Sequence, residues 1–137
     1  MKYDYWGLLK HLKHPLKSVY VLHGDETLLQ QEALIALRHA ANKQGFSERE
    51  RHDIDRGHDW AMAFADSNAL SLFSYKKLIE IHGNKPDAAG GKVLEAYLKN
   101  PPEDNVVILV IPKLEAAAFK SKWFSACEDN GVTVSCA

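Results

Sequence analysis

Short runs of β-branched and aliphatic residues alternate with longer segments of helical periodicity along this chain. The runs predict five strands, at residues 18–24, 48–55, 76–83, 105–111 and 132–136. The fourth run, "NVVILVI", is apolar from Val106 to Ile111 without a break, which is typical of a strand covered on both faces in the middle of a parallel sheet. The second run, "ERERHDID", is polar and indicates an edge strand.

The segments between these runs place apolar residues at helical spacing. Helices are expected over residues 5–12, 27–44, 59–67, 92–100 and 115–129, with a Gly- and Pro-containing loop at 83–91. In the last helix, the residues expected to face the core are Ala118, Phe119, Trp123, Phe124 and Cys127. Strands that alternate with helices imply right-handed crossovers. The predicted fold class is therefore α/β: a three-layer sandwich with a five-stranded, mostly parallel sheet.

Composition limits the chain to one ordinary domain. It has 137 residues, of which 46% are hydrophobic, so residues 1–137 can bury a core of their own. With 17 basic and 18 acidic residues, the net charge of -1 provides no broad attraction for nucleic acid or for an anionic membrane. No apolar run approaches the roughly 18 residues of a membrane span, the N-terminus is unlike a signal peptide, and two cysteines make no disulfide framework. We expect a cytoplasmic protein.

One segment has the position of a phosphate-binding loop. "VYVLHGDETLLQQ" runs from a strand through Gly24 into a helix, but the P-loop pattern requires Gly, Lys and Ser or Thr where residues 29–31 are "LQQ". Asp25 and Glu26 add negative charge where phosphates would lie. The strand "KLIEIHG" also lacks an acidic pair at its end for magnesium, and Glu80 inside it is interpreted as a packed or edge carboxylate. We therefore expect no ATP binding.

Other familiar sites each lack an essential residue. A phosphate-accepting receiver domain needs an aspartate at the end of the third strand, where the chain has His82 and Gly83. Cys127 lies one turn from Trp123 and Phe124, which predicts a buried, unreactive thiol. Residues of metal-ligand type gather at His52, Asp53, Asp55, His58 and Asp59. No cysteine joins them and their spacing matches no common ligand pattern, so polar decoration of an edge strand is the favoured interpretation, and no metal or catalytic site is predicted.

The stretch "NALSLFSYKK" places apolar residues where a loop between a helix and a strand is normally polar. Leu70, Leu72 and Phe73 surround the single Ser71, just before the strand that begins near residue 76. Two interpretations compete. Either these side chains cover the core beneath the loop, as most Leu and Phe residues do, or they are exposed for a partner.

The order of motifs over nearly the whole chain resembles a known protein family. The most specific features are Gly24, Leu28, Leu29 and Glu32 at the first long helix, "SLF" at 71–73, and the late group Lys120, Trp123 and Phe124. Together they resemble the N-terminal domain of the delta subunit of the bacterial DNA polymerase III clamp loader. The resemblance implies a degenerate AAA+ P-loop fold without a nucleotide site, and a single domain at 1–137 of a larger subunit whose lid and collar domains lie outside this chain.

The resemblance also implies a role for "SLF", which in that family is an exposed hook for the ring-shaped sliding clamp. Carried over, Leu72 and Phe73 would insert into an apolar pocket of the clamp, with Leu70 beside them and Ser71 turning the backbone. The implied function is to bind and open the sliding β clamp during DNA replication, without a cofactor and without catalysis by this domain. Polymerase activity would belong to the whole complex, and the other clamp-loader subunits are further expected partners.

Two other functions remain open on the sequence alone. One is a P-loop-like ATPase that uses Gly24 and its neighbours. The other is a weak DNA-binding module that uses the lysines of the second half of the chain: Lys76, Lys77, Lys85, Lys120 and Lys122. The near-neutral charge balance argues for weak DNA contact at most.

Overall fold

The computed structural model of the protein describes residues 1–54, 60, 63–64 and 76–137. Its strands are β1 (Lys2–Asp4), β2 (Val19–His23), β3 (Glu48–Ile54), β4 (Lys77–Gly83), β5 (Asn105–Ile111) and β6 (Val132–Ser135). Its helices are α1 (Tyr5–His11), α2 (Thr27–Lys43), α4 (Ala88–Lys99), the short 3-10 helix η1 (Ala116–Lys120) and α5 (Lys122–Asn130).

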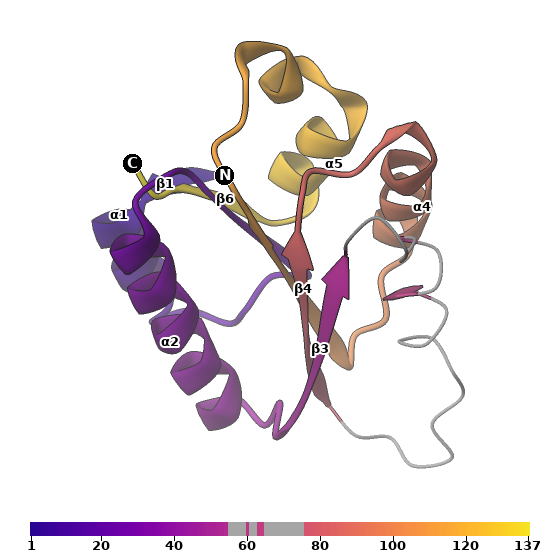
Figure 1. The fold of residues 1–137 in the computed structure, drawn as a ribbon. Helices are drawn as coiled ribbons and strands as arrows, with labels where there is room; N and C mark the ends of the chain where they lie inside the picture. The colour runs from indigo at the N-terminus through magenta and orange to yellow at the C-terminus, as the bar shows by residue number, and fades with distance from the viewer. Residues whose placement is uncertain (55–59, 61–62, 65–75) are drawn as a thin grey trace.

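All strand pairs of the sheet are parallel, in the order β1-β6-β2-β5-β4-β3. Helices α1 and α2 lie on one side and α4 and α5 on the other, which gives the three layers expected from the sequence (Figure 1). The predicted edge position of β3 and the central position of β5 are confirmed. The sheet has six strands where five were predicted, because the short β1 pairs with β6 through the register Lys2 to Thr133.

Side chains of the strands alternate between the two faces and form two cores. On β2, Tyr20 and Leu22 belong to the core shared with α1 and α2. Val19 and Val21 belong to the core shared with α4 and α5. On β5, residues 106–109 are at most 2% exposed, so both faces of this strand are covered, as the uninterrupted apolar run predicted.

Helix α4 begins four residues earlier than the sequence suggested. Asp87 caps it, because its Oδ1 accepts a hydrogen bond from the Gly90 amide at 2.7 Å. Gly90 and Gly91 had indicated a loop, since glycine is a weak helix former. A Cβ at Gly90 would lie 2.7 Å from the ring of Trp60, so close packing between segments requires glycine here despite its low helix propensity.

The helix predicted over 115–129 is divided in two at Ser121. This serine caps α5, its Oγ accepting a hydrogen bond from the Phe124 amide at 3.4 Å, and its backbone is extended. Phe119 in η1 is 40% exposed, so its predicted core position is wrong, whereas Trp123 and Phe124 are buried as predicted. Cys127 is also buried, as predicted, and burial raises the pKa of its thiol to about 12. No helix among the described residues has the length and apolar content that crossing a membrane requires.

The two isoleucines Ile108 and Ile35 allow a matched test of the core. Ile108 of β5 is fully buried, and Ile35 of α2 is 57% exposed. Ile108→Ala is expected to lower the free energy of unfolding by about 2–5 kcal/mol, through lost burial and an unfilled cavity. Ile35→Ala is expected to change it by at most about 0.5 kcal/mol. Urea denaturation measures both, and equal losses would contradict the assignment of β5 to the centre of the core.

Candidate functional site

The loop after β2 is closed by the end of β6. Gly24 has φ of +137°, and a Cβ there would lie 2.1 Å from the carbonyl oxygen of Cys136. The Glu26 amide donates to that carbonyl oxygen at 3.0 Å, and the Cys136 amide donates to the carbonyl oxygen of His23 at 2.7 Å. Gly24 is therefore required by close contact with the chain's own backbone, and the space beside it is occupied by protein.

The first turn of α2 is capped by the chain itself. The Glu26 carboxylate accepts a hydrogen bond from the Leu28 amide at 3.3 Å, which places a negative charge where a phosphate would bind. Gln30 stands at the position of the P-loop lysine, and its side-chain amide donates to the carbonyl oxygens of Leu22 and Ile111, at 3.2 and 2.6 Å. Gln30 therefore ties α2 to the ends of two strands.

The buried Glu80 of β4 belongs to an ion-pair network instead of a magnesium site. Its carboxylate accepts hydrogen bonds from Arg38 Nε and Nη2 at 2.6 and 2.8 Å, and it lies 2.9 Å from His82 Nε2. The side chain is 0% exposed, which confirms the packed position over the edge alternative. Burial by itself would raise the pKa of Glu80, but the hydrogen bonds from Arg38 and His82 and their charges outweigh it and lower the pKa to about 2.

No group of three or more His, Cys, Asp or Glu residues in the described ranges is arranged to hold a metal ion. Two members of the predicted polar cluster are described, and each has a neighbour on the same strand. Arg51 lies 3.0 Å from Asp53, and His52 lies 3.4 Å from Glu50. The remaining members, Asp55, His58 and Asp59, lie outside the described residues.

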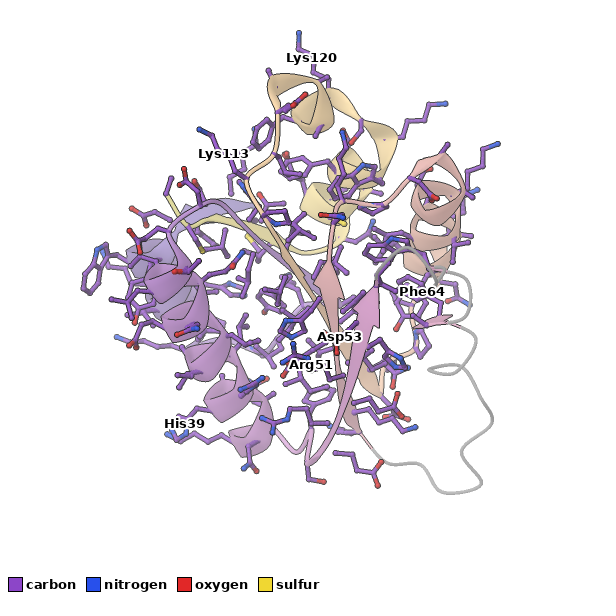
Figure 2. The ribbon with its side chains drawn as sticks, viewed as in Figure 1. His39, Arg51, Asp53, Phe64, Lys113 and Lys120 are labelled. Carbon is purple, nitrogen blue, oxygen red and sulfur yellow. The ribbon has the colours of Figure 1, made fainter. Side chains whose placement is uncertain are left out.

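The predicted hook, Leu70, Ser71, Leu72 and Phe73, also lies outside the described residues. Its described flanks are tied to the fold on both sides. Phe64 is 3% exposed and its ring lies 4.9 Å from that of Tyr97, centroid to centroid. Figure 2 shows Phe64 beside α4. After the hook, Lys76 places its ammonium 5.2 Å from the ring centroid of Phe46.

The lysines considered for DNA binding do not form one patch. Lys76 and Lys77 are at the start of β4, whereas Lys85 follows its end, and a seven-residue strand is about 23 Å long. Lys77 is held 2.9 Å from Glu50. Lys120 lies at the outer tip of η1, far from the start of β4 (Figure 2).

Comparison with known proteins identifies the family of this chain. The sequence model of the family described as "DNA polymerase III, delta subunit" matches residues 20–137. The chain belongs to this delta subunit family. It is 33% identical over 131 residues to DNA polymerase III subunit delta of Escherichia coli (strain K12), covering 94% of this chain and 38% of that protein. It is 30% identical to the Haemophilus influenzae subunit of the same name, covering 92% and 38%.

Two solved structures share the fold of this chain. The Bacillus subtilis DNA clamp loader delta protein (YqeN) superposes with a TM-score of 0.73 at 18% identity, covering 96% of this chain and 42% of that chain. A gamma subunit-related protein of DNA polymerase III from Thermotoga maritima superposes with a TM-score of 0.61 at 13% identity, covering 96% and 45%. The fold is therefore AAA+-like. The chain spans less than half the length of each of these relatives.

Sequence reasoning missed the Arg38, Glu80 and His82 network. The available signal was a glutamate inside an otherwise apolar strand, because a carboxylate buried in a sheet requires a cationic partner. Its partner, Arg38, lies 42 residues away on α2. Nothing in the local pattern distinguishes Arg38 from the other basic residues of that helix.

Loss of Arg38 is expected to destabilise the fold strongly. Arg38→Ala leaves the Glu80 carboxylate buried without its main partner, which costs about 3–5 kcal/mol in the free energy of unfolding. Arg51→Ala removes an ion pair whose side chains are 55% and 65% exposed, and is expected to cost about 1 kcal/mol or less. Urea denaturation at neutral pH compares the two, and a small loss for Arg38→Ala would contradict the proposed role of the network.

The same network predicts a specific acid sensitivity. The folded-state pKa of Glu80 is about 2, below its ordinary value of 4.5, so its contribution to stability is complete above pH 4.5 and is lost as the pH falls towards 2. In Glu80→Gln, the free energy of unfolding is expected to depend less steeply on pH over this interval. Glu48→Gln, at an exposed position of β3, should leave the slope as in the parent protein. Identical slopes for all three would contradict the assignment.

Proposed function

We propose that this chain is the clamp-binding domain of a clamp-loader subunit in DNA replication, and that it binds and opens the sliding β clamp through Leu72 and Phe73. The observation that carries the proposal is a delta-family domain whose nucleotide loop is filled by its own backbone and carboxylates. Since an AAA+-like fold does not by itself assign a function, the proposal is supported by the family and by this occupied loop together.

The loop geometry disfavours the ATPase alternative. A bound phosphate would need the free amides at the start of α2, yet Glu26 already accepts from one of them and Cys136 accepts from the amide of Glu26 itself. Asp25 lies 3.9 Å from Lys113, which places a further carboxylate at the same loop. The proposed function therefore requires no ATP on this domain.

The energy available from the hook defines what else the interaction needs. Burial of a Leu and a Phe side chain contributes roughly 1.5–3 kcal/mol each, before the cost of association is subtracted. A micromolar complex requires about 8 kcal/mol. Leu72 and Phe73 therefore act as the central anchor of a larger interface, in which Leu70, Ser71 and neighbouring surface take part.

Clamp opening follows from differential binding and needs no chemical step. A partner that fits the open ring better than the closed ring shifts the ring towards opening by the difference between the two binding energies. Phe64 and Lys76 flank the hook and are tied to α4 and to Phe46, so the hook is attached to a packed domain that can transmit force. The other loader subunits are proposed partners of the same subunit, DNA contact by this domain is proposed to be weak, and the complex is cytoplasmic.

The hook is tested by the double variant Leu72→Ala with Phe73→Ala. Clamp affinity is expected to fall at least about 100-fold, because about 3–6 kcal/mol of apolar burial is removed from the interface. Isothermal titration calorimetry with the purified clamp measures the affinity, and circular dichroism melting checks that the fold survives. Retained affinity in a folded double variant would refute the proposed site.

A further inference from the structure

We propose that the groove between α2 and the edge strand β3 is a second contact surface for the sliding clamp, and that its arginines receive carboxylate side chains of an acidic segment of the clamp. We name it the arginine groove, formed by Arg38, Arg49 and Arg51 with the residues between them. The inference rests on the proposed function, since it takes the clamp as the partner. It assigns a role to surface that the hook does not use.

The groove exists because α2 does not extend over β3. In the parallel register, Arg49 pairs with Leu78 and Arg51 pairs with Glu80, so these side chains lie on the same face of the sheet. That face is the one which α2 covers, because Leu78 belongs to the α2 core and Glu80 bonds Arg38. Beyond β4 the cover ends, and the arginines of β3 are exposed beside the helix.

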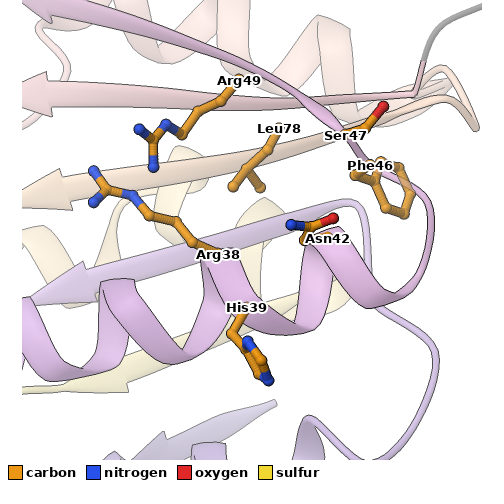
Figure 3. Close-up of a pocket in the computed structure, with 7 residues that line it drawn as sticks. All are labelled: Arg38, His39, Asn42, Phe46, Ser47, Arg49 and Leu78. Atoms are coloured by element: carbon orange, nitrogen blue, oxygen red, sulfur yellow. The ribbon is translucent and has the colours of Figure 1, made fainter.

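Two adjacent hollows, of about 410 and 430 Å³, make up the groove. They share Arg38, which therefore stands at their junction. Figure 3 shows Arg38 reaching from α2 and Arg49 from β3 towards the same space, with Leu78 between them, while His39 points away. The two walls of the groove thus bring the guanidinium groups of Arg38 and Arg49 into the same space (Figure 3).

The positive charge of the groove is only partly neutralised. Arg38 is committed to Glu80, which is fully buried and also meets His82. Arg51 is paired with Asp53 in an exposed pair that water screens. The Arg49 side chain is exposed, and its guanidinium makes no hydrogen bond or ion pair within the described part of the chain. A carboxylate that enters the groove would therefore find a free guanidinium at Arg49 and a partly exposed one at Arg38.

The rim of the groove suits a protein surface better than a nucleic-acid backbone. Ile35 lines one hollow and is 57% exposed, and Leu28, two turns earlier on α2, is 62% exposed. Apolar side chains beside arginines are typical of protein interfaces. The exposed carboxylates Asp25, Glu26 and Glu32 at the start of α2 would repel a continuous run of phosphates, whereas an acidic peptide segment can place its few carboxylates at the arginines alone.

The position of the groove agrees with a clamp held at the hook. Phe46 and Ser47 line the end of the groove near the start of β4, and the ring of Phe46 contacts Lys76. Phe73 precedes Lys76 by three residues, which span at most about 11 Å of chain. A clamp that holds Phe73 is therefore within reach of the Phe46 end of the arginine groove.

The test compares Arg49→Glu with Lys92→Glu in the full-length subunit, with the purified sliding clamp as the probe. Lys92 is an exposed residue of α4, on the opposite side of the sheet, so it carries the same change of charge away from the groove. Arg49→Glu is expected to slow association and weaken clamp binding about tenfold at low salt, with a smaller loss at high salt where screening is stronger. Lys92→Glu should bind as the parent subunit does. The clamp affinity of Arg49→Gln should lie between those of Arg49→Glu and the parent subunit.

Equal clamp binding by Arg49→Glu and Lys92→Glu overturns the groove, and the proposed function still stands if the Leu72 and Phe73 double variant loses binding. If that double variant binds normally while Arg49→Glu does not, the hook fails and the groove stands. A loss of duplex DNA binding by Arg49→Glu, with clamp binding unchanged, would make the groove a nucleic-acid surface and overturn the inference. The folding control is thermal melting: Arg49→Glu is expected to melt at the same temperature as the parent subunit.

Discussion

A fully buried carboxylate in β4 joins the sheet to helix α2 on one face of this domain. Glu80 remains ionised inside the sheet because Arg38 and His82 bond it, so α2 is joined to β4 by a charged contact as well as by apolar packing. This contact holds Arg38 of α2 against β4, beside the apolar packing of the helix on the sheet. Since the cover ends at β4, the neighbouring face of β3 stays exposed, and Arg38 lines the hollow that lies between α2 and Arg49 of β3.

The loop after β2, at the position of a nucleotide-binding loop, joins β2 and α2 to the end of β6 through backbone hydrogen bonds. Gly24 has a positive φ, and the backbone that it approaches is that of Cys136. Gln30 and Glu26 use their polar groups on the chain itself. The result is an AAA+-like domain of the delta subunit family in which the loop after β2 is occupied by the chain's own backbone and side chains.

Much of the architecture could be predicted because it depends on local pattern. The run 105–111 has the same bounds in the sequence prediction and in the structure, since six consecutive apolar residues are typical of a strand covered on both faces. β1 was missed because "KYD" has no apolar run and is a strand only through its pairing with β6. The early start of α4 was missed because Gly90 and Gly91 weaken a helix locally, and only the approach of Trp60 explains why glycine is required there.

By itself, the sequence determined the α/β class, the polar edge strand, the mismatch with the P-loop residue pattern and the resemblance that the family comparison confirmed. These features follow from residue type and spacing along the chain, because the spacing of apolar residues determines which face of a helix or strand can be buried. Only the tertiary structure decided that Glu80 meets Arg38, that the end of β6 fills the loop after β2, and that Arg38 and Arg49 border one groove. Such pairings join residues far apart in the chain, and their partners are selected by the packing of helix on sheet, which no local pattern contains.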